Sequence, residues 1–129
     1  DLREHQKEIY TIEWSPTGPG SPNPNKALVL ASASFDATVK LWDIERGCTR
    51  FTLSRNDESV YSVAFSPSGD YLASGSLAGH LCVWSVRDGH LVKSYQGSGD
   101  IFEVAWNHRE DKIAACFSTS VVTVLDFRV

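Results

Sequence analysis

The chain has 129 residues, of which 42% are hydrophobic and 22% are charged. This composition is typical of a soluble globular domain, and no segment resembles a signal peptide or a membrane span. Twelve Lys and Arg stand against 16 Asp and Glu, which gives a net charge of −4. The basic residues are scattered, whereas a groove for nucleic acid needs them clustered, so direct binding of nucleic acid is disfavoured.

Short strands are expected from the start of the chain. Residues 9–16 (IYTIEWSP) join β-branched and aromatic residues, and Ser-Pro ends the run. A polar loop rich in Gly, Pro and Asn follows at residues 17–26. Residues 28–43 (LVLASASFDATVKLWD) then contain two strands that flank a tight turn at residues 35–37. Residues 48–53 complete a unit of four strands.

The same unit recurs twice. VYSVAFSP at residues 60–67 and IFEVAWN at residues 101–107 repeat the first strand. Their starts lie about 41 residues apart, close to the period of about 40–45 residues of four-stranded propeller blades. YLASGSLAGHLCVWS at residues 71–85 and KIAACFSTSVVTVLD at residues 112–126 repeat the second and third strands. No helical periodicity competes with this pattern.

We therefore predict an all-β fold: part of a WD40-type β-propeller with about three four-stranded antiparallel blades, the last lacking its fourth strand. Residues 1–4 are expected to be the tail of an upstream blade. The three blades are expected at residues 5–55, which include the long loop, at residues 56–96, and at residues 97–129. The remaining blades of the same ring would then be partners of this segment.

The cysteines favour an intracellular protein. Cys48, Cys82 and Cys116 have no CxxC spacing and lie in expected strands. We expect buried, reduced thiols, which suit a nuclear or cytosolic location.

Over nearly its whole length the chain resembles the WD-repeat family, and most closely the C-terminal blades of the transducin beta-like proteins. The likeness rests on EIYTIEWSPTGPG, LASASFDATVKLWD, VYSVAFSP and YLASGS. The resemblance implies a non-catalytic scaffold in a nuclear corepressor complex that contains histone deacetylase, with the other subunits of that complex as partners. The family's F-box-like region leaves an alternative, a substrate-recognition module of a ubiquitin ligase.

The resemblance also implies a buried hydrogen-bonded set in each blade. In the first blade this set falls on four residues: His5, Ser32, Asp36 and Trp42. The second blade has Asn56, Ser74, Ala78 and Trp84 at these positions. The third has Cys116 and Leu125, and its turn at residues 118–120 is expected to be one residue shorter.

No catalytic, cofactor or metal site is expected. His5, Ser32 and Asp36 are the residue types of a hydrolase triad, but Ser32 lies within a strand and no G-x-S-x-G elbow is present. The histidines have no ligand spacing, and no Gly-rich segment precedes a helix.

The predicted partner-binding face is one end of the propeller, where the segments before the first strands meet the turns between second and third strands. An aromatic residue recurs there, and acidic residues beside it favour a basic partner segment such as a histone tail. The alternative is that the rings pack between blades. The predicted residues are Glu8, Tyr10, Phe35, Ser59, Tyr61, Leu77, Asp100, Phe102 and Thr119. The loop at residues 17–26, on the opposite face, is either a tolerated insertion or a binding element.

Overall fold

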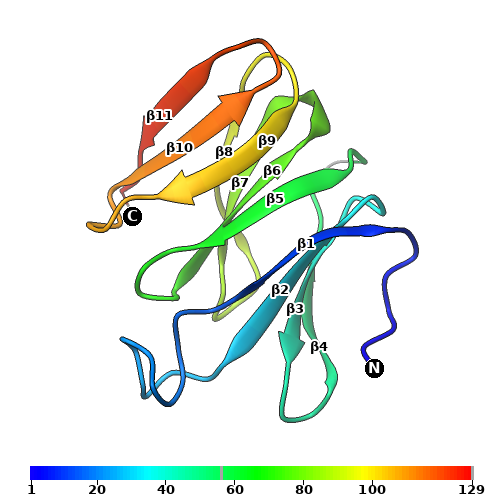
Figure 1. Cartoon of the computed structure of the whole chain (residues 1–129), viewed down its shortest axis with the longest axis vertical. Coiled ribbons are helices and arrows are strands. Elements are labelled where there is room, and N and C mark those ends of the chain that lie inside the picture. Colours follow the sequence, from blue (N-terminus) through cyan, green and yellow to red (C-terminus); the bar gives the residue numbers. More distant parts are fainter. Residues whose placement is uncertain (56, 129) are drawn as a thin grey trace.

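In the computed structural model the chain forms three antiparallel sheets, which confirms the all-β prediction (Figure 1). The structure describes residues 1–55 and 57–128. The first sheet has the order β1-β2-β3-β4. Its strands are β1 (Ile9–Trp14), β2 (Val29–Ser34), β3 (Val39–Asp43) and β4 (Cys48–Leu53).

The other two sheets repeat this arrangement. The second has the order β5-β6-β7-β8, and the third contains β9, β10 and β11. The strands of the second sheet are β5 (Val60–Phe65), β6 (Tyr71–Ser76), β7 (His80–Ser85) and β8 (Leu91–Gln96), with the 3-10 turn η1 (Leu77–Gly79) between β6 and β7. Those of the third are β9 (Ile101–Trp106), β10 (Lys112–Phe117) and β11 (Val122–Asp126).

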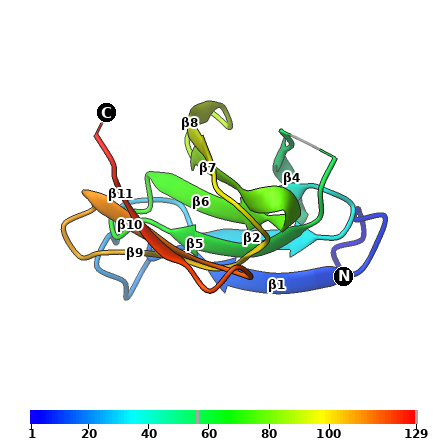
Figure 2. The same ribbon diagram turned by 90° about the horizontal axis from the view of Figure 1, so that it is seen from above.

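The first strands of the three sheets, β1, β5 and β9, run side by side (Figure 1). Seen from above, they lie along one side of the molecule, and β4 and β8 project toward the opposite side (Figure 2). Each sheet is therefore a blade with an inner and an outer edge. Residues 1–4 form no strand, and Glu4 Oε2 accepts a hydrogen bond from the backbone N of Thr49 in β4 at 3.2 Å.

Two apolar clusters hold the blades together, one at each boundary. The first contains residues of β2 and β3 together with Val60, Val63 and Phe65 of β5. The second contains Leu81 and Val83 of β7 together with residues of β9 and β10. The middle blade is covered on both faces, which is why β6 and β7 are almost continuously buried and do not alternate.

The outer face of the first blade remains uncovered. Ile9, Ile12 and Trp14 are 48%, 61% and 54% exposed. Their counterparts in the second blade, Val60, Val63 and Phe65, are all buried against the first blade. The exposed side chains thus belong to a packing face that no described residue of the chain covers.

The third blade leaves the complementary face open. Val122 and Val124 of β11 are 72% and 60% exposed. Their counterparts in β7, Leu81 and Val83, are buried at the second boundary. Both ends of the three-blade segment are therefore apolar. No helix in the described part of the chain is long and apolar enough to cross a membrane.

The cysteines are all free, but they differ in burial. Cys82 is buried and Cys116 is partly buried, whereas Cys48 is exposed. The expectation of a buried thiol is wrong for Cys48, because it opens the outermost strand of its blade, where side chains alternate between the sheet and solvent.

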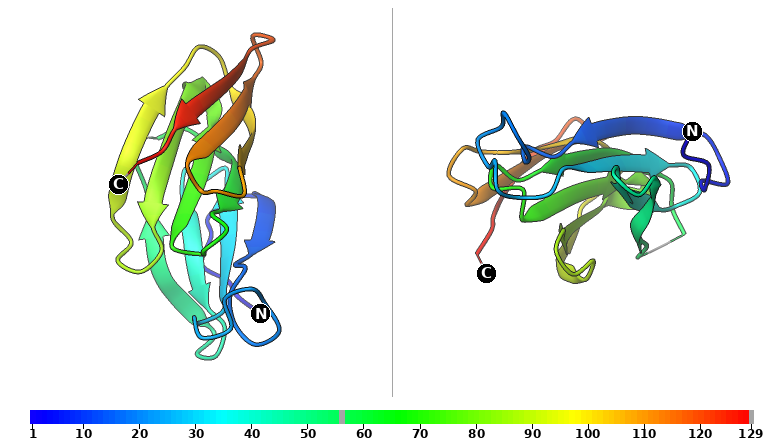
Figure 3. Two further views of the ribbon diagram at one scale, coloured as in Figure 1. Left: turned by 90° about the vertical axis from the view of Figure 1, so that its left-hand side faces the viewer. Right: turned by 90° about the horizontal axis from the view of Figure 1, so that it is seen from below.

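The long loop at residues 17–26 connects β1 to β2 and contacts the next blade. It lies beside the turn between β3 and β4 at one end of the molecule (Figures 1 and 3). Asn23 Nδ2 donates to the carbonyls of Pro16 and Pro67, at 2.7 and 2.9 Å. Lys26 Nζ donates to the carbonyl of Ser68 and to Asp70 Oδ1, at 2.7 and 3.0 Å. The loop thus clamps the first blade to the β5–β6 turn of the second.

The open faces predict self-association of the isolated 129-residue chain. Fully burying one large apolar side chain stabilises by about 1.5–3 kcal/mol, so the Ile12 face of one copy is expected to pack on the Val124 face of another. Analytical ultracentrifugation should show association that grows with concentration, and the double variant Ile12→Lys, Val124→Lys should weaken it. A monomeric wild-type chain with a sharp cooperative melt at all concentrations would contradict this prediction.

The clamp predicts a loss of stability for Asn23→Ala. The variant leaves two carbonyls, one in each blade, without their shared donor, and we expect the free energy of unfolding of the full-length protein to fall by about 1 kcal/mol. Asn25→Ala is the matched control, because Asn25 is exposed and its side chain makes no hydrogen bond within the described residues. Urea unfolding of both variants tests this, and equal effects would show that the loop is not a clamp.

Candidate functional site

A chain of hydrogen bonds runs through the first blade. Trp42 Nε1 donates to Ser32 Oγ at 2.8 Å, and Ser32 Oγ lies 2.6 Å from His5 Nε2. His5 Nδ1 lies 2.8 Å from Asp36 Oδ2. These hydrogen bonds connect β3, β2, the segment before β1 and the β2–β3 turn. The structure thus brings together all four residues of the set expected in this blade.

The direction of the protons follows from the groups involved. The indole N–H can only donate, and the Asp36 carboxylate can only accept. His5 Nδ1–H therefore donates to Asp36, and Ser32 Oγ, which accepts from Trp42, shares a hydrogen bond with His5 Nε2. Such a fully satisfied buried set holds its strands in one arrangement.

Asp36 supplies the negative charge in this row of hydrogen bonds. Its burial alone would raise its pKa, but hydrogen bonds from Thr38, from the backbone of Gln6 and from His5 outweigh that effect and hold the pKa far below its ordinary value. The backbone of Gln6 donates to Oδ2 at 2.9 Å, and the backbone of Thr38 donates to Oδ1 at 3.0 Å. The carboxylate therefore also fixes the turn that contains it.

The geometry of this set differs from that of a hydrolase triad. Ser32 is 2% exposed, and its hydroxyl oxygen already accepts a hydrogen bond from Trp42. A nucleophile must reach its substrate, whereas Ser32 is buried within strand β2. Within residues 1–55 and 57–128, no cluster of His, Cys, Asp and Glu side chains could hold a metal ion.

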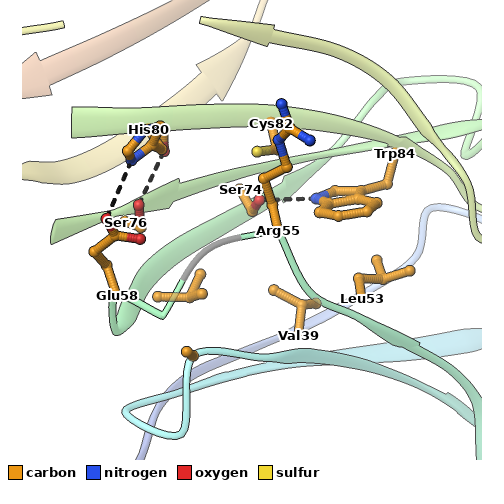
Figure 4. Close-up of a pocket in the computed structure, with 11 residues that line it drawn as sticks. Val39, Leu53, Arg55, Glu58, Ser74, Ser76, His80, Cys82 and Trp84 are labelled. Atoms are coloured by element: carbon orange, nitrogen blue, oxygen red, sulfur yellow. Dashed lines mark hydrogen bonds and ion pairs between the residues drawn. The ribbon is translucent and has the colours of Figure 1, made fainter. Parts of the chain in front are cut away.

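The second blade keeps only part of the set. Trp84 Nε1 donates to Ser74 Oγ at 2.9 Å, and a cavity of about 20 Å³ adjoins this pair (Figure 4). Ala78 stands in the place of the aspartate, with a φ of 68°. Glu58 and His80 also line this cavity and point toward one another, with Oε1 and Nδ1 3.7 Å apart (Figure 4). The predicted counterpart of His5, Asn56, lies outside the described residues.

The expected alignment of the third blade with the first is wrong. The connection from β10 to β11 comprises residues 118–121, the same length as residues 35–38 in the first blade, so the turn is not shorter. Ala115 pairs with Val104 as Ser32 pairs with Ile12, which places Ala115, and not Cys116, at the serine position. This blade therefore has neither the serine nor the indole, and apolar packing replaces them.

Four aromatic rings form a continuous row across the blades, which we call the aromatic rim: Tyr10, Phe35, Tyr61 and Phe102. The rings of Tyr10 and Tyr61 stack with centroids 4.1 Å apart, and Phe35 meets Tyr10 edge-on at 3.9 Å. Phe102 meets Tyr61 edge-on at 5.7 Å and is 50% exposed. The rings thus pack on one another across the blade boundaries and also present a surface to solvent.

Backbone hydrogen bonds fix the position of the rim. The carbonyls of Glu8, Ser59 and Asp100 accept from the backbone N of Phe35, Leu77 and Ser118, at 3.0, 3.0 and 2.8 Å. Ser118, and not Thr119, is therefore the counterpart of Phe35 and Leu77. The match predicted for Thr119 is wrong by one residue, because the third turn has the full length. Thr119 is exposed, and its Oγ1 donates to the carbonyl of Ser98 at 2.9 Å.

Acidic groups border the aromatic rim. Partial burial raises the pKa of Tyr10 to about 12, and the neighbouring Tyr61 phenol and the Glu8 carboxylate add to this rise. Asp100 Oδ1 accepts a hydrogen bond from the backbone N of Ala78 at 2.9 Å, so this carboxylate also ties the second and third blades together. Glu8 and Glu103 are exposed. Ser118, Glu58 and Glu103 were not predicted from the sequence. An alignment of the third blade backward from Asp126 without a gap gives Ser118.

The repeated four-stranded blades and the His5 to Trp42 set define a WD-repeat propeller, and the chain belongs to this family. The family of the WD domain, G-beta repeat, matches residues 1–43 and 47–85. The crystal structure of the C-terminal WD40 domain of Sif2 matches with a TM-score of 0.81 at 20% sequence identity, over 98% of this chain and 36% of that one. That likeness shows the fold.

Particular relatives are much more similar in sequence. The WD40 repeat-containing protein HOS15 of Arabidopsis thaliana is 61% identical over 129 residues, which are 100% of this chain and 21% of that protein. The human F-box-like/WD repeat-containing protein TBL1Y is 59% identical over 104 residues, 81% of this chain and 20% of that protein. The likeness to the transducin beta-like proteins is thereby confirmed. This chain spans about a fifth of the length of these relatives.

The depressed pKa of Asp36 predicts a pH-dependent stability. As the pH falls below the ordinary value of 3.8, the unfolded chain takes up a proton before the folded one does, so the contribution of Asp36 is present above about pH 4 and is lost below it. Asp36→Asn should lower the free energy of unfolding by about 2 kcal/mol at pH 7, and by less at pH 3.

Urea unfolding of the full-length protein, followed by tryptophan fluorescence, measures this difference. Asp126→Asn is the control, because its pKa is also lowered but its partner Lys112 lies on an exposed surface. The control should change stability only slightly at either pH. A difference for Asp36→Asn that is the same at pH 7 and pH 3 would count against the charged role of Asp36.

Proposed function

We propose that the chain is part of a non-catalytic scaffold that binds a basic peptide segment of a partner protein on the aromatic rim. The row of four rings carries this proposal, because it is solvent-accessible, continuous over three blades and rigidly held by backbone hydrogen bonds. Aromatic residues dominate the binding energy of protein interfaces, since each offers a large apolar area and loses little conformational entropy.

The charge around the rim favours a basic partner. Glu8 is exposed and close enough to Tyr10 to raise the pKa of its phenol, and neither Glu8 nor the exposed Glu103 of β9 forms an ion pair within the described residues. A cation can also lie over an aromatic face, where it gains about 0.5–2 kcal/mol. A histone tail is one segment of this chemistry. The interaction should weaken with salt, because exposed charges are screened within about 8–10 Å at physiological ionic strength.

The similarity to the transducin beta-like proteins supports a place in a transcriptional corepressor complex with histone deacetylase, in the nucleus. An alternative is a substrate-recognition module of an F-box-type ubiquitin ligase, favoured by the words F-box-like in the name of the human relative. Both functions would use the same rim, and they differ in which complex the rest of the protein joins.

Phe102→Ala is the sharpest test of the rim. Phe102 is 50% exposed and has one aromatic neighbour, so its loss should hardly change the melting temperature of the full-length protein. Affinity for a basic histone-tail peptide should fall about tenfold, equivalent to about 1.4 kcal/mol. Tyr61→Ala should weaken binding as well, with a larger loss of stability, because Tyr61 stacks on Tyr10.

The matched control is Tyr95→Ala, which removes an exposed ring from the outer strand β8. Fluorescence anisotropy with the labelled peptide should give the wild-type affinity for this variant. If wild type and Phe102→Ala bind the peptide with equal affinity, the rim is not part of the binding surface. Affinity purification of the full-length protein, followed by mass spectrometry, distinguishes the two proposed functions. Deacetylase and corepressor subunits would support the corepressor scaffold, and cullin-type ligase subunits would support the ubiquitin-ligase module.

A further inference from the structure

A second cleft lies between the first and second blades, at the end of the strands opposite the aromatic rim. Its volume is about 290 Å³. It is enclosed by the end of the loop at residues 17–26, by β4, by the β5–β6 turn and by the segment after β7. Four of the residues that line it are charged: Lys26, Arg50, Asp70 and Arg87.

The floor of this cleft offers apolar surface and no free polar group. Val29 and Val86 are buried there. Ser15 Oγ accepts from the backbone N of Val29 at 2.9 Å, and Thr17 Oγ1 donates to the carbonyl of Ala27 at 2.7 Å. Any charged group that enters the cleft is therefore recognised by its walls.

The walls carry an excess of positive charge. Lys26 and Asp70 neutralise one another at 3.0 Å. Arg50 and Arg87 are exposed, and within residues 1–55 and 57–128 neither forms an ion pair. The guanidinium of Arg50 lies over the ring of Phe51, 5.6 Å from its centroid, which limits its freedom. Two arginines without an ion pair among the described residues thus line one cleft in a chain whose net charge is −4.

We propose that this cleft binds the phosphate of a phosphorylated serine or threonine in an extended segment of a partner protein. A phosphate monoester carries a charge of about −1.5 to −2 at neutral pH, which matches two arginines. Each planar guanidinium can donate two parallel hydrogen bonds to phosphate oxygens. The volume suits a single side chain with its phosphate. A carboxylate has half the charge, so a glutamate at the same place binds more weakly.

The test uses the full-length protein and three labelled peptides, acetylated and amidated, of the form Ala-Gly-X-Gly-Ala, where X is phosphoserine, serine or glutamate. Fluorescence anisotropy should show that the phosphoserine peptide binds at least tenfold more tightly than the serine peptide and also more tightly than the glutamate peptide. The double variant Arg50→Gln, Arg87→Gln should lose this preference. Both side chains are exposed, so the variant should keep the melting temperature of the wild type.

Arg46→Gln is the matched control, because Arg46 is an exposed arginine of the β3–β4 turn that does not line the cleft. It should bind the phosphoserine peptide as the wild type does, and so should Phe102→Ala, since the aromatic rim is at the other end. Equal binding of the phosphoserine and serine peptides would overturn the proposal. The proposal would also be overturned if the glutamate peptide bound as tightly as the phosphoserine peptide. The same holds if Arg46→Gln lost as much affinity for the phosphoserine peptide as the double variant.

Discussion

The packing of blade on blade is the constraint on which the structure depends. A four-stranded antiparallel sheet with two apolar faces is stable in water only when both faces are covered. The middle blade meets this condition within the chain, and its strands β6 and β7 are buried almost throughout. The outer blades meet it on one face only, which leaves Ile12 and Val124 exposed at opposite ends. We infer that further blades of a ring cover these faces, as in the larger propeller domain that the chain matches.

Polar side chains add specificity to this apolar packing, to a different degree in each blade. The first blade has a continuous chain from Trp42 to Asp36, in which each buried donor has an acceptor. The second retains the indole and the serine, with Ala78 in the place of the carboxylate. The third has Ala115 and Leu125 in place of the serine and the indole, and it is held by packing. The β2–β3 turn of the first blade is therefore held by hydrogen bonds to the side chains of Ser34 and Asp36. This turn places Phe35 in the aromatic rim.

The sequence was sufficient to predict the fold, because the Trp42-Asp43 ending and the repeated first strand are local patterns with a known period. It was misleading at Thr119, because the third blade lacks the aspartate and the tryptophan that mark the register, which the strand pairing restores. The contacts of the rim follow from the angle between neighbouring blades, which no local pattern encodes. The cleft with Arg50 and Arg87 could not be predicted either, since residues of two blades meet there only after folding.

In our proposal the aromatic rim is the surface on which the protein binds its partner. Photo-crosslinking in cells tests it most directly, with a benzophenone amino acid placed at Phe102 of the full-length protein and, as a control, at Tyr95. We expect crosslinks from Phe102 to a lysine- or arginine-rich segment of another protein, with far fewer from Tyr95. Crosslinks that are confined to the protein's own chain, or that are equally frequent at both positions, would contradict it.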